Sequence, residues 1–135
     1  MGDPTYNPAT HGTEAAAISR GMVALTRQTA GRGPVSARTT IGREHVLVMM
    51  NECLTQGERN LIRAGKTDEV HTLRASYQEL LEPPAIKLVE EVLQRKVIAF
   101  MSANHFDPDR AAEVFVLDPS EANGQAMQEA EATES

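Results

Sequence analysis

The chain has 135 residues, of which 41% are hydrophobic, so it can bury a core of ordinary size and fits a single domain. The formal net charge is -6, yet residues 15–43 contain five arginines and no acid, which makes this segment the one basic region of the chain. Proteins that bind nucleic acids usually present a basic surface and stack bases on aromatic rings. The negative net charge, the few aromatic residues and the absence of tryptophan therefore disfavour nucleic-acid binding.

The cysteine count and the hydropathy pattern predict a cytoplasmic protein. Cys53 is the only cysteine, so no intrachain disulfide can form, and a reducing compartment fits best. The first residues lack the basic segment and apolar run of a secretory signal. No apolar run approaches the roughly 20 residues of a membrane-spanning helix, so any membrane link is expected to be peripheral or through a partner.

The N-terminal part predicts a lead-in followed by one helix. Residues 1–13 contain two prolines and two glycines and are expected to be disordered. Apolar residues then recur at helical spacing through Met22 and Leu25, which predicts a helix over residues 14–30. Thr13 is the expected cap, and Gly31 is the expected stop. If the Met22 and Leu25 face pointed outward, it could serve a homodimer.

The next segments predict a strand pair and then a short helix. Residues 37–41 and 45–50 read as two strands turned at Gly42 and Arg43, and the apolar run VLVMM predicts an inner strand covered on both faces. Thr55, followed three residues later by Glu58, has the form of a capping box and predicts a helix that runs to residue 63.

A longer amphipathic helix is expected to follow from about residue 67. Val70, Leu73, Tyr77 and Leu80 recur at steps of three and four, which predicts the face that packs on the core. The pattern continues beyond the Pro-Pro pair at 83–84. Proline inside a helix loses a hydrogen bond and clashes with the preceding turn, so a break or kink is expected near residue 82.

The C-terminal part predicts a β-hairpin and an acidic tail. Residues 97–101 and 114–117 carry the β-branched and aromatic residues of strands, and residues 102–110 between them read as a polar turn. From residue 118 onward there are five acids and no lysine or arginine, and large apolar residues are scarce. Residues 119–135 are therefore expected to form a disordered acidic tail.

The order of these elements predicts the fold class. It runs helix, strand, strand, helices, strand, strand, which is typical of an α+β protein. We expect one domain over residues 14–118, with a four-stranded, mainly antiparallel sheet and the helices packed on one face.

The hairpin tip is the first candidate functional surface, because it gathers Asn104, His105, Asp107 and Asp109 within six residues. Imidazole and carboxylates in this pattern could bind a divalent metal, or His105 could act as a general acid or base. Turn chemistry alone also explains the asparagine and the Asp-Pro-Asp sequence. The spacing matches no closed zinc pattern, so the sequence predicts no metal and no cofactor, and a surface for a partner or a small ligand remains open.

The basic segment supplies a second candidate, a site for an anion. Arg32 lies between two glycines, and Arg38 and Arg43 follow in the strand pair, so their guanidinium groups could hold a phosphate or carboxylate. The alternative is that these arginines are solvated surface residues. The glycines lack the Lys-Ser/Thr ending, which excludes a P-loop, and they follow a helix and not a strand, which excludes a Rossmann fingerprint. We also hypothesise that the acidic tail folds back over this basic patch. Cys53 is expected to be a buried, inert thiol.

Several motifs together resemble one family of small bacterial proteins. They are GRGP at 31–34, ARTTI at 37–41, LT at 54–55 with Glu58, and VIAFMSANHFDPD at 97–109 running into EVFVL. The family was first catalogued as a domain of unknown function and later labelled MpsC-like, after a sodium-translocating, membrane-potential-generating system. The resemblance spans about residues 16–119. It implies a link to ion transport, which a chain without a spanning segment could have only as an accessory subunit or a regulator.

These observations leave two hypotheses for the function. The first is a non-enzymatic accessory or regulatory module that acts through protein contacts. The second is a ligand-binding or metal-dependent enzyme domain, with His105 and Asp107 at the hairpin tip and Arg32 and Arg38 holding an anionic substrate. The second requires that the hairpin tip and the GRGP loop converge on one concave pocket.

Overall fold

The computed structural model describes residues 11–120. The expected acidic tail from residue 121 onward and residues 1–10 of the expected lead-in lie outside this range. Helix α1 begins at residue 12, inside the segment expected as lead-in. The elements of the described chain are α1 (Gly12–Ala30), β1 (Ser36–Ile41), β2 (His45–Asn51), α2 (Gln56–Arg63), α3 (Thr67–Leu93), β3 (Val97–His105) and β4 (Arg110–Leu117).

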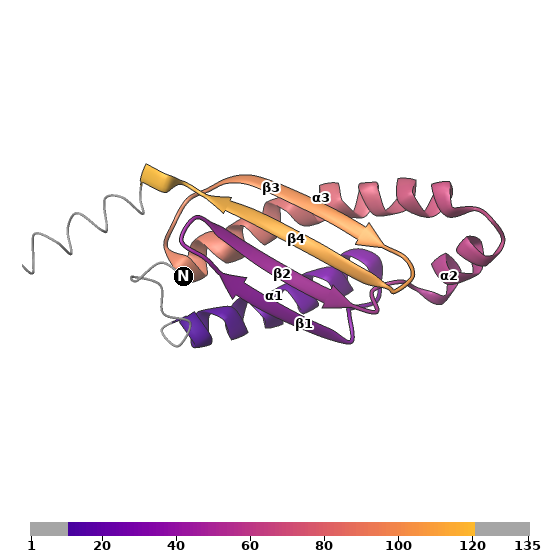
Figure 1. Ribbon diagram of the computed structural model, residues 1–135, viewed down its shortest axis with the longest axis horizontal. Helices are drawn as coiled ribbons and strands as arrows, with labels where there is room; N and C mark the ends of the chain where they lie inside the picture. The colour runs from indigo at the N-terminus through magenta and orange to yellow at the C-terminus, as the bar shows by residue number, and fades with distance from the viewer. Residues whose placement is uncertain (1–10, 121–135) are drawn as a thin grey trace, which may run out of the picture.

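The four strands form one sheet in the order β1-β2-β4-β3, and every pairing is antiparallel (Figure 1). β4 runs between β2 and β3, so the two hairpins of the chain join along β2 and β4. The predicted α+β class, element order and antiparallel sheet are confirmed.

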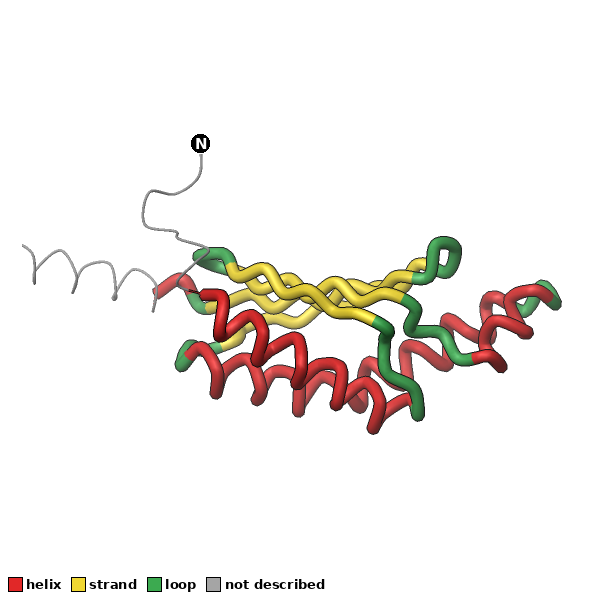
Figure 2. The backbone as a smooth tube through the Cα atoms, turned by 90° about the horizontal axis from the view of Figure 1, so that it is seen from below, coloured by secondary structure: helices red, strands yellow, loops and turns green. Residues whose placement is uncertain are grey.

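The molecule has two layers, because α1 and α3 lie on the same side of the sheet (Figure 2). Alternate strand residues point toward these helices and are buried, as period-two alternation requires. The core between the layers includes Ile18, Met22, Val46, Val48, Met50, Val89, Phe115 and Leu117. Met22 is fully buried in this core, so its face of α1 is not a surface for a dimer.

Helix α1 crosses α3 at a glycine. A Cβ atom on Gly21 would come within 2.6 Å of Leu88 Cδ2, so the absence of a side chain lets the two helices approach closely at this point. α1 also contacts the sheet, where a hydrogen bond of 2.8 Å between the hydroxyls of Ser19 and Thr39 joins it to β1.

The final hairpin has longer arms than predicted. β3 continues to His105 and β4 begins at Arg110, so only residues 106–109 form the turn, and the expected loop over 102–110 is wrong for most of its length. The added strand residues are small or polar, including Ala103, Ala111 and Ala112, and lack the β-branched side chains on which the prediction relied. Cross-strand pairing holds them in the sheet despite their weak individual preference.

Helix α3 corrects two further predictions. It continues through Pro83 and Pro84 without interruption, so the expected break is absent. Its buried side carries Val70, Arg74 and Leu81. Leu80, placed in the core by the sequence pattern, is 65% exposed, and Leu73 is 37% exposed.

The starts of the first two helices differ in their caps. The capping box of Thr55 and Glu58 at α2 is confirmed, with both reciprocal hydrogen bonds present. The predicted Thr13 cap is wrong, because α1 begins two residues earlier than expected, at Gly12, after His11. Gly31, with φ of 78°, ends α1 as expected.

Candidate functional site

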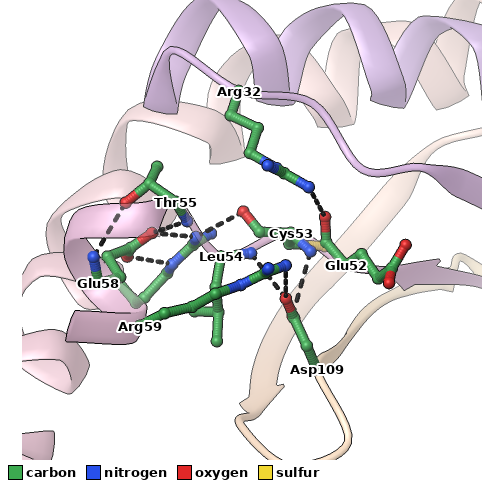
Figure 3. Close-up of polar contacts among 9 residues, drawn as sticks. Arg32, Glu52, Cys53, Leu54, Thr55, Glu58, Arg59 and Asp109 are labelled. Carbon is green, nitrogen blue, oxygen red and sulfur yellow. Dashed lines mark hydrogen bonds and ion pairs between the residues drawn. The ribbon is translucent and has the colours of Figure 1, made fainter. Parts of the chain in front are cut away.

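A polar junction joins the hairpin tip to the segment between β2 and α2 (Figure 3). The Asp109 carboxylate accepts hydrogen bonds from the backbone N–H groups of Cys53 (3.1 Å) and Leu54 (3.0 Å). The backbone carbonyl of Asp109 accepts a third from the N–H of Glu52 (2.9 Å). One residue thus satisfies three consecutive N–H groups, and Glu52, with φ of 57°, takes the left-handed backbone conformation next to this contact.

Next to the junction lies a buried ion pair between α2 and α3. Arg74 donates from Nε to Glu58 Oε2 (2.7 Å) and from Nη2 to Glu58 Oε1 (2.6 Å). Nη2 also donates to the carbonyl of Cys53 (2.8 Å). The side chains are 7% and 2% exposed, and the paired fork geometry is the strong form of this interaction. The pair and the capping box fix α2 against α3.

Two side chains in and beside the junction, Cys53 and Glu58, have shifted pKa values. Burial raises the pKa of Glu58, but hydrogen bonds from Arg74 and Thr55 outweigh it, so the pKa lies below its usual value. Burial and the Asp109 charge raise the pKa of the Cys53 thiol to about 11. The thiol is therefore protonated near neutral pH and is a poor nucleophile, in agreement with the expectation of an inert cysteine.

The four predicted residues of the hairpin tip point to different surroundings. Asn104 lies on the inner side of β3 and lines a cavity next to the core. His105 Nδ1 is 2.8 Å from the carbonyl oxygen of Pro108, Asp107 is exposed, and Asp109 turns into the junction. Within residues 11–120 no three His, Cys, Asp or Glu side chains are placed to hold a metal ion.

The three predicted anion-binding arginines are not brought together. Arg32 lies near the junction and donates to the carbonyl of Glu52 (3.5 Å), while Arg38 is exposed on the outer side of β1. Arg43 lies in the turn after β1, and its carbonyl accepts a bond from Arg95 (2.6 Å). The GRGP loop and the hairpin tip do meet at one end of the sheet. Of the residues named for the two sites, however, only Asn104 lines the cavity there.

Three charged residues that sequence reasoning did not select are buried here: Glu58, Arg74 and Glu113. Glu58 was assigned only a capping role. A signal for Arg74 existed, because it lies four residues after Val70 on the buried side of α3. The sequence also indicated that Glu113 is buried, because residues that alternate along a strand point to the same side and Glu113 alternates with the buried Phe115 and Leu117.

The side of the sheet opposite the helices has no covering element in the described chain (Figure 2). We call the strand residues that point to this side the open face. Its two central rows, taken across β1, β2, β4 and β3, are Thr40, Leu47, Val114 and Met101, and Arg38, Met49, Ala112 and Ala103.

The open face combines an apolar centre with cations. Met101 is 54% exposed, and Leu47, Met49 and Val114 are half-buried. Arg38 and Arg110 lie beside this centre, and no strand residue that points to this side within the described chain is a carboxylate. The expectation that β2 is an inner strand holds, but no element of the described residues covers its second face, contrary to the expectation.

Comparison with known proteins places the chain in a family. The family model described as "MpsC: Na+-translocating membrane potential-generating system (MpsC)" matches residues 10–119, a range that includes every helix and strand described above. The chain belongs to the MpsC family. The resemblance noted in the sequence is thereby confirmed. No curated protein and no solved structure matches this MpsC chain.

The MpsC match includes the polar junction, the cavity and the open face. None of the helices formed by residues 11–120 of this MpsC chain combines the length and the apolar character needed to cross a bilayer.

Proposed function

We propose that this MpsC protein is an accessory or regulatory module that works in the cytoplasm by binding a partner protein on its open face. The observation that carries the proposal is the apolar centre formed by Leu47, Met49, Val114 and Met101, which no element of residues 11–120 covers. Uncovered apolar surface of this kind is typical of interaction sites. The name of the family supports a partner from a membrane ion-transport system, with this protein attached to that system through the contact.

The charges on the open face indicate the chemistry of the partner. Arg38 and Arg110 lie beside the apolar centre, and no carboxylate of the strands accompanies them. A segment with apolar side chains and carboxylates would satisfy both features, because complementary charges favour encounter and register. Two open faces would instead bring arginines toward arginines, which disfavours a second copy of the chain as the occupant.

A peptide-binding measurement tests this proposal. The probe is a fluorescent peptide of alternating Leu and Glu, and a Leu and Lys peptide of the same length is its control. We expect the full-length protein to bind the acidic peptide, more weakly at higher salt, and to bind the basic peptide at least tenfold more weakly. Met101→Gln and Arg38→Glu should each weaken binding of the acidic peptide about tenfold, a loss of about 1.4 kcal/mol.

The matched control is Arg20→Glu, which changes the same charge on the exposed side of α1. It should leave the affinity unchanged. Equal affinities for Arg38→Glu and Arg20→Glu would overturn the proposal. So would wild-type dimerisation that Arg38→Glu abolishes, or flotation with anionic phospholipid vesicles that Arg38→Glu abolishes, because these results assign the open face to a second copy or to a lipid surface.

A further inference from the structure

A small cavity lies on the inner side of the sheet, between α1, α3 and the hairpin end of the strands. Its volume is about 30 Å³, counted as the space open to the centre of a water molecule. A single water needs about 10–15 Å³ on this measure, so the cavity holds about two water-sized groups. Its polar lining comes from α1, α3, β3, β4 and the segment after β2, and includes Thr26, Cys53, Arg74, Tyr77, Asn104 and Glu113.

Glu113 is the chemically unusual member of this lining. The residue is 3% exposed, and its Oε2 atom is buried without a hydrogen-bond partner. Buried carboxyl oxygens are normally paired, since an unpaired one loses its hydration without compensation. Arg74, the nearby cation, is already committed to Glu58 and to the carbonyl of Cys53. Glu113 Oε2 therefore lacks a donor, although the Ser102 hydroxyl, which is itself unpaired, lies across from it on β3.

The groups around Glu113 limit what that donor can be. The space admits about two non-hydrogen atoms. Too few metal-ligating side chains surround it for a metal site within the described residues. The charge of Arg74 is balanced by Glu58, so a cation entering beside Glu113 would meet one uncompensated carboxylate. The Asn104 amide oxygen and the Thr26 hydroxyl can accept further N–H bonds.

We propose that this cavity binds the primary ammonium group of a small amine, with Glu113 as its counter-ion. The nitrogen donates to Glu113 Oε2 and to the neutral oxygens of the lining, and the attached carbon fills the remaining space. This site is independent of the open face, because it lies on the opposite side of the sheet. It retains one element of the ligand-binding hypothesis from the sequence, since Asn104 lines it.

Binding should depend on pH through Glu113. Burial raises the pKa of this carboxyl to about 7, and the Ser102 side chain and the charge of Arg74 oppose the shift only in part. The other groups that face it are the Cys53 thiol, the Tyr77 phenol, Asn104, Ser102 opposite it on β3, and Thr26 from α1. Cys53, with a pKa of about 11, stays neutral. An ammonium ion must displace the proton of Glu113, so its affinity should rise nearly tenfold per pH unit below pH 7 and level off above it.

Nuclear magnetic resonance titration of the full-length protein with methylammonium chloride tests the inference. We expect saturable shifts of the Glu113 backbone amide and the Asn104 side-chain amide. Tetramethylammonium, which has no N–H donor, should give none. Glu113→Gln keeps the shape and removes the charge, so it should weaken methylammonium binding at least tenfold at pH 8. Glu52→Gln, an exposed change at the same end of the sheet, is the matched control and should bind as the wild type does.

Three results would overturn the inference. The first is an affinity that Glu113→Gln leaves unchanged, and the second is the absence of saturation up to about 100 mM methylammonium, a ceiling that corresponds to a binding free energy too small to mark a site. The third is an equal saturable response to NaCl, which would assign the cavity to a metal cation. Heteronuclear spectra of each variant, with wild-type dispersion, separate loss of binding from loss of fold.

Discussion

Asp109 connects two parts of the chain that are 56 residues apart in sequence at its bond to Cys53. Its carboxylate and carbonyl accept the N–H groups of residues 52–54, and its carboxylate also contacts Arg59 at 3.4 Å. Asp107, two residues away, is exposed and has no such role. The two aspartates of one turn therefore form a matched pair for mutation.

Replacement of Asp109 by Asn should destabilise the fold. Asn removes the charge and replaces one acceptor oxygen by a donor that faces backbone N–H groups. Hydrogen bonds to a charged group contribute about 1.5–3 kcal/mol, so we expect a loss of this size in the free energy of unfolding, measured in urea. Asp107→Asn should change it by less than about 0.5 kcal/mol. Equal midpoints for the two variants would refute the role given to Asp109.

Arg74 and Glu58 should show strong coupling. Arg74→Met leaves the Glu58 carboxylate buried without its partner, which should cost about 3–5 kcal/mol of stability. Glu58→Gln preserves the capping box and removes the charge. The double variant should therefore be more stable than Arg74→Met alone. A double-mutant cycle in urea measures this coupling, and strictly additive losses would contradict it.

At the scale of elements, periodicity predicted which helices and strands exist, and non-local contacts decided where they end. The β-branched residues of β2 and the capping box of α2 gave correct elements because their signals are local. The arms of the last hairpin were too short in the prediction, because Ala103 and Ala111 become strand residues only through pairing. On α3 the prediction was correct for Val70 but placed Leu73 and Leu80 on the buried side, which in the structure carries Arg74 and Leu81, since an arginine was not expected to face the core.

The candidate sites were harder to predict than the elements, for the same reason. The prominent polar residues of the hairpin tip were visible in the sequence, but they separate in space. The residues that the structure buries together, Glu58, Arg74 and Glu113, come from three elements that are distant in sequence. No spacing within one segment relates them.

Pro83 offers a test of how α3 tolerates its proline pair. A proline at this position cannot donate to the carbonyl of Glu79 and crowds that turn, but Glu79 and Pro83 are both exposed, so water can solvate the carbonyl. Pro83→Ala should restore the bond and stabilise the protein by about 1–3 kcal/mol, less than the full cost of an interior proline because the unfolded chain gains freedom.

The measurement is the thermal midpoint, which should rise by about 4 °C or more for a domain of this size. The control is Pro34→Ala. Pro34 lies buried in the connection between α1 and β1, where replacement loosens the unfolded chain and removes packed ring atoms, so its midpoint should fall. A midpoint for Pro83→Ala at or below that of the wild type would show that the helix has adapted fully to the ring.

At the scale of the whole molecule, β4 serves both sides of the sheet. Its inward residues include Glu113 at the cavity, and its outward residues include Val114 on the open face. The proposed docking surface and the proposed amine site thus share one strand but face opposite layers. A change at one can be made without altering the contacts of the other.

The pH dependence of stability should reflect two carboxyl groups that act in opposite directions. The lowered pKa of Glu58 contributes stability that is lost as the pH falls below about 4.5, its unfolded value. The raised pKa of Glu113 means that the folded state holds more protons than the unfolded state between 4.5 and about 7. Stability should therefore fall as the pH rises through this window, by up to about 3 kcal/mol.

Glu113→Gln should abolish the fall between pH 5 and pH 8, because the side chain can no longer ionise. Urea unfolding at both pH values checks this, with Glu52→Gln as an exposed control that retains the wild-type difference. The prediction fails if Glu113→Gln gains no more stability relative to the wild type at pH 8 than at pH 5.

The three N–H groups held by Asp109 also have a consequence in time. Because their acceptors belong to one residue, a fluctuation that lifts the hairpin tip releases all three together, whereas the N–H of Thr55, bound to Glu58, depends on α2 instead. Amides 52–54 should then exchange with solvent deuterium at a common opening rate. That rate would report how often the hairpin tip separates from the end of β2, at a position in the chain remote from the turn that moves.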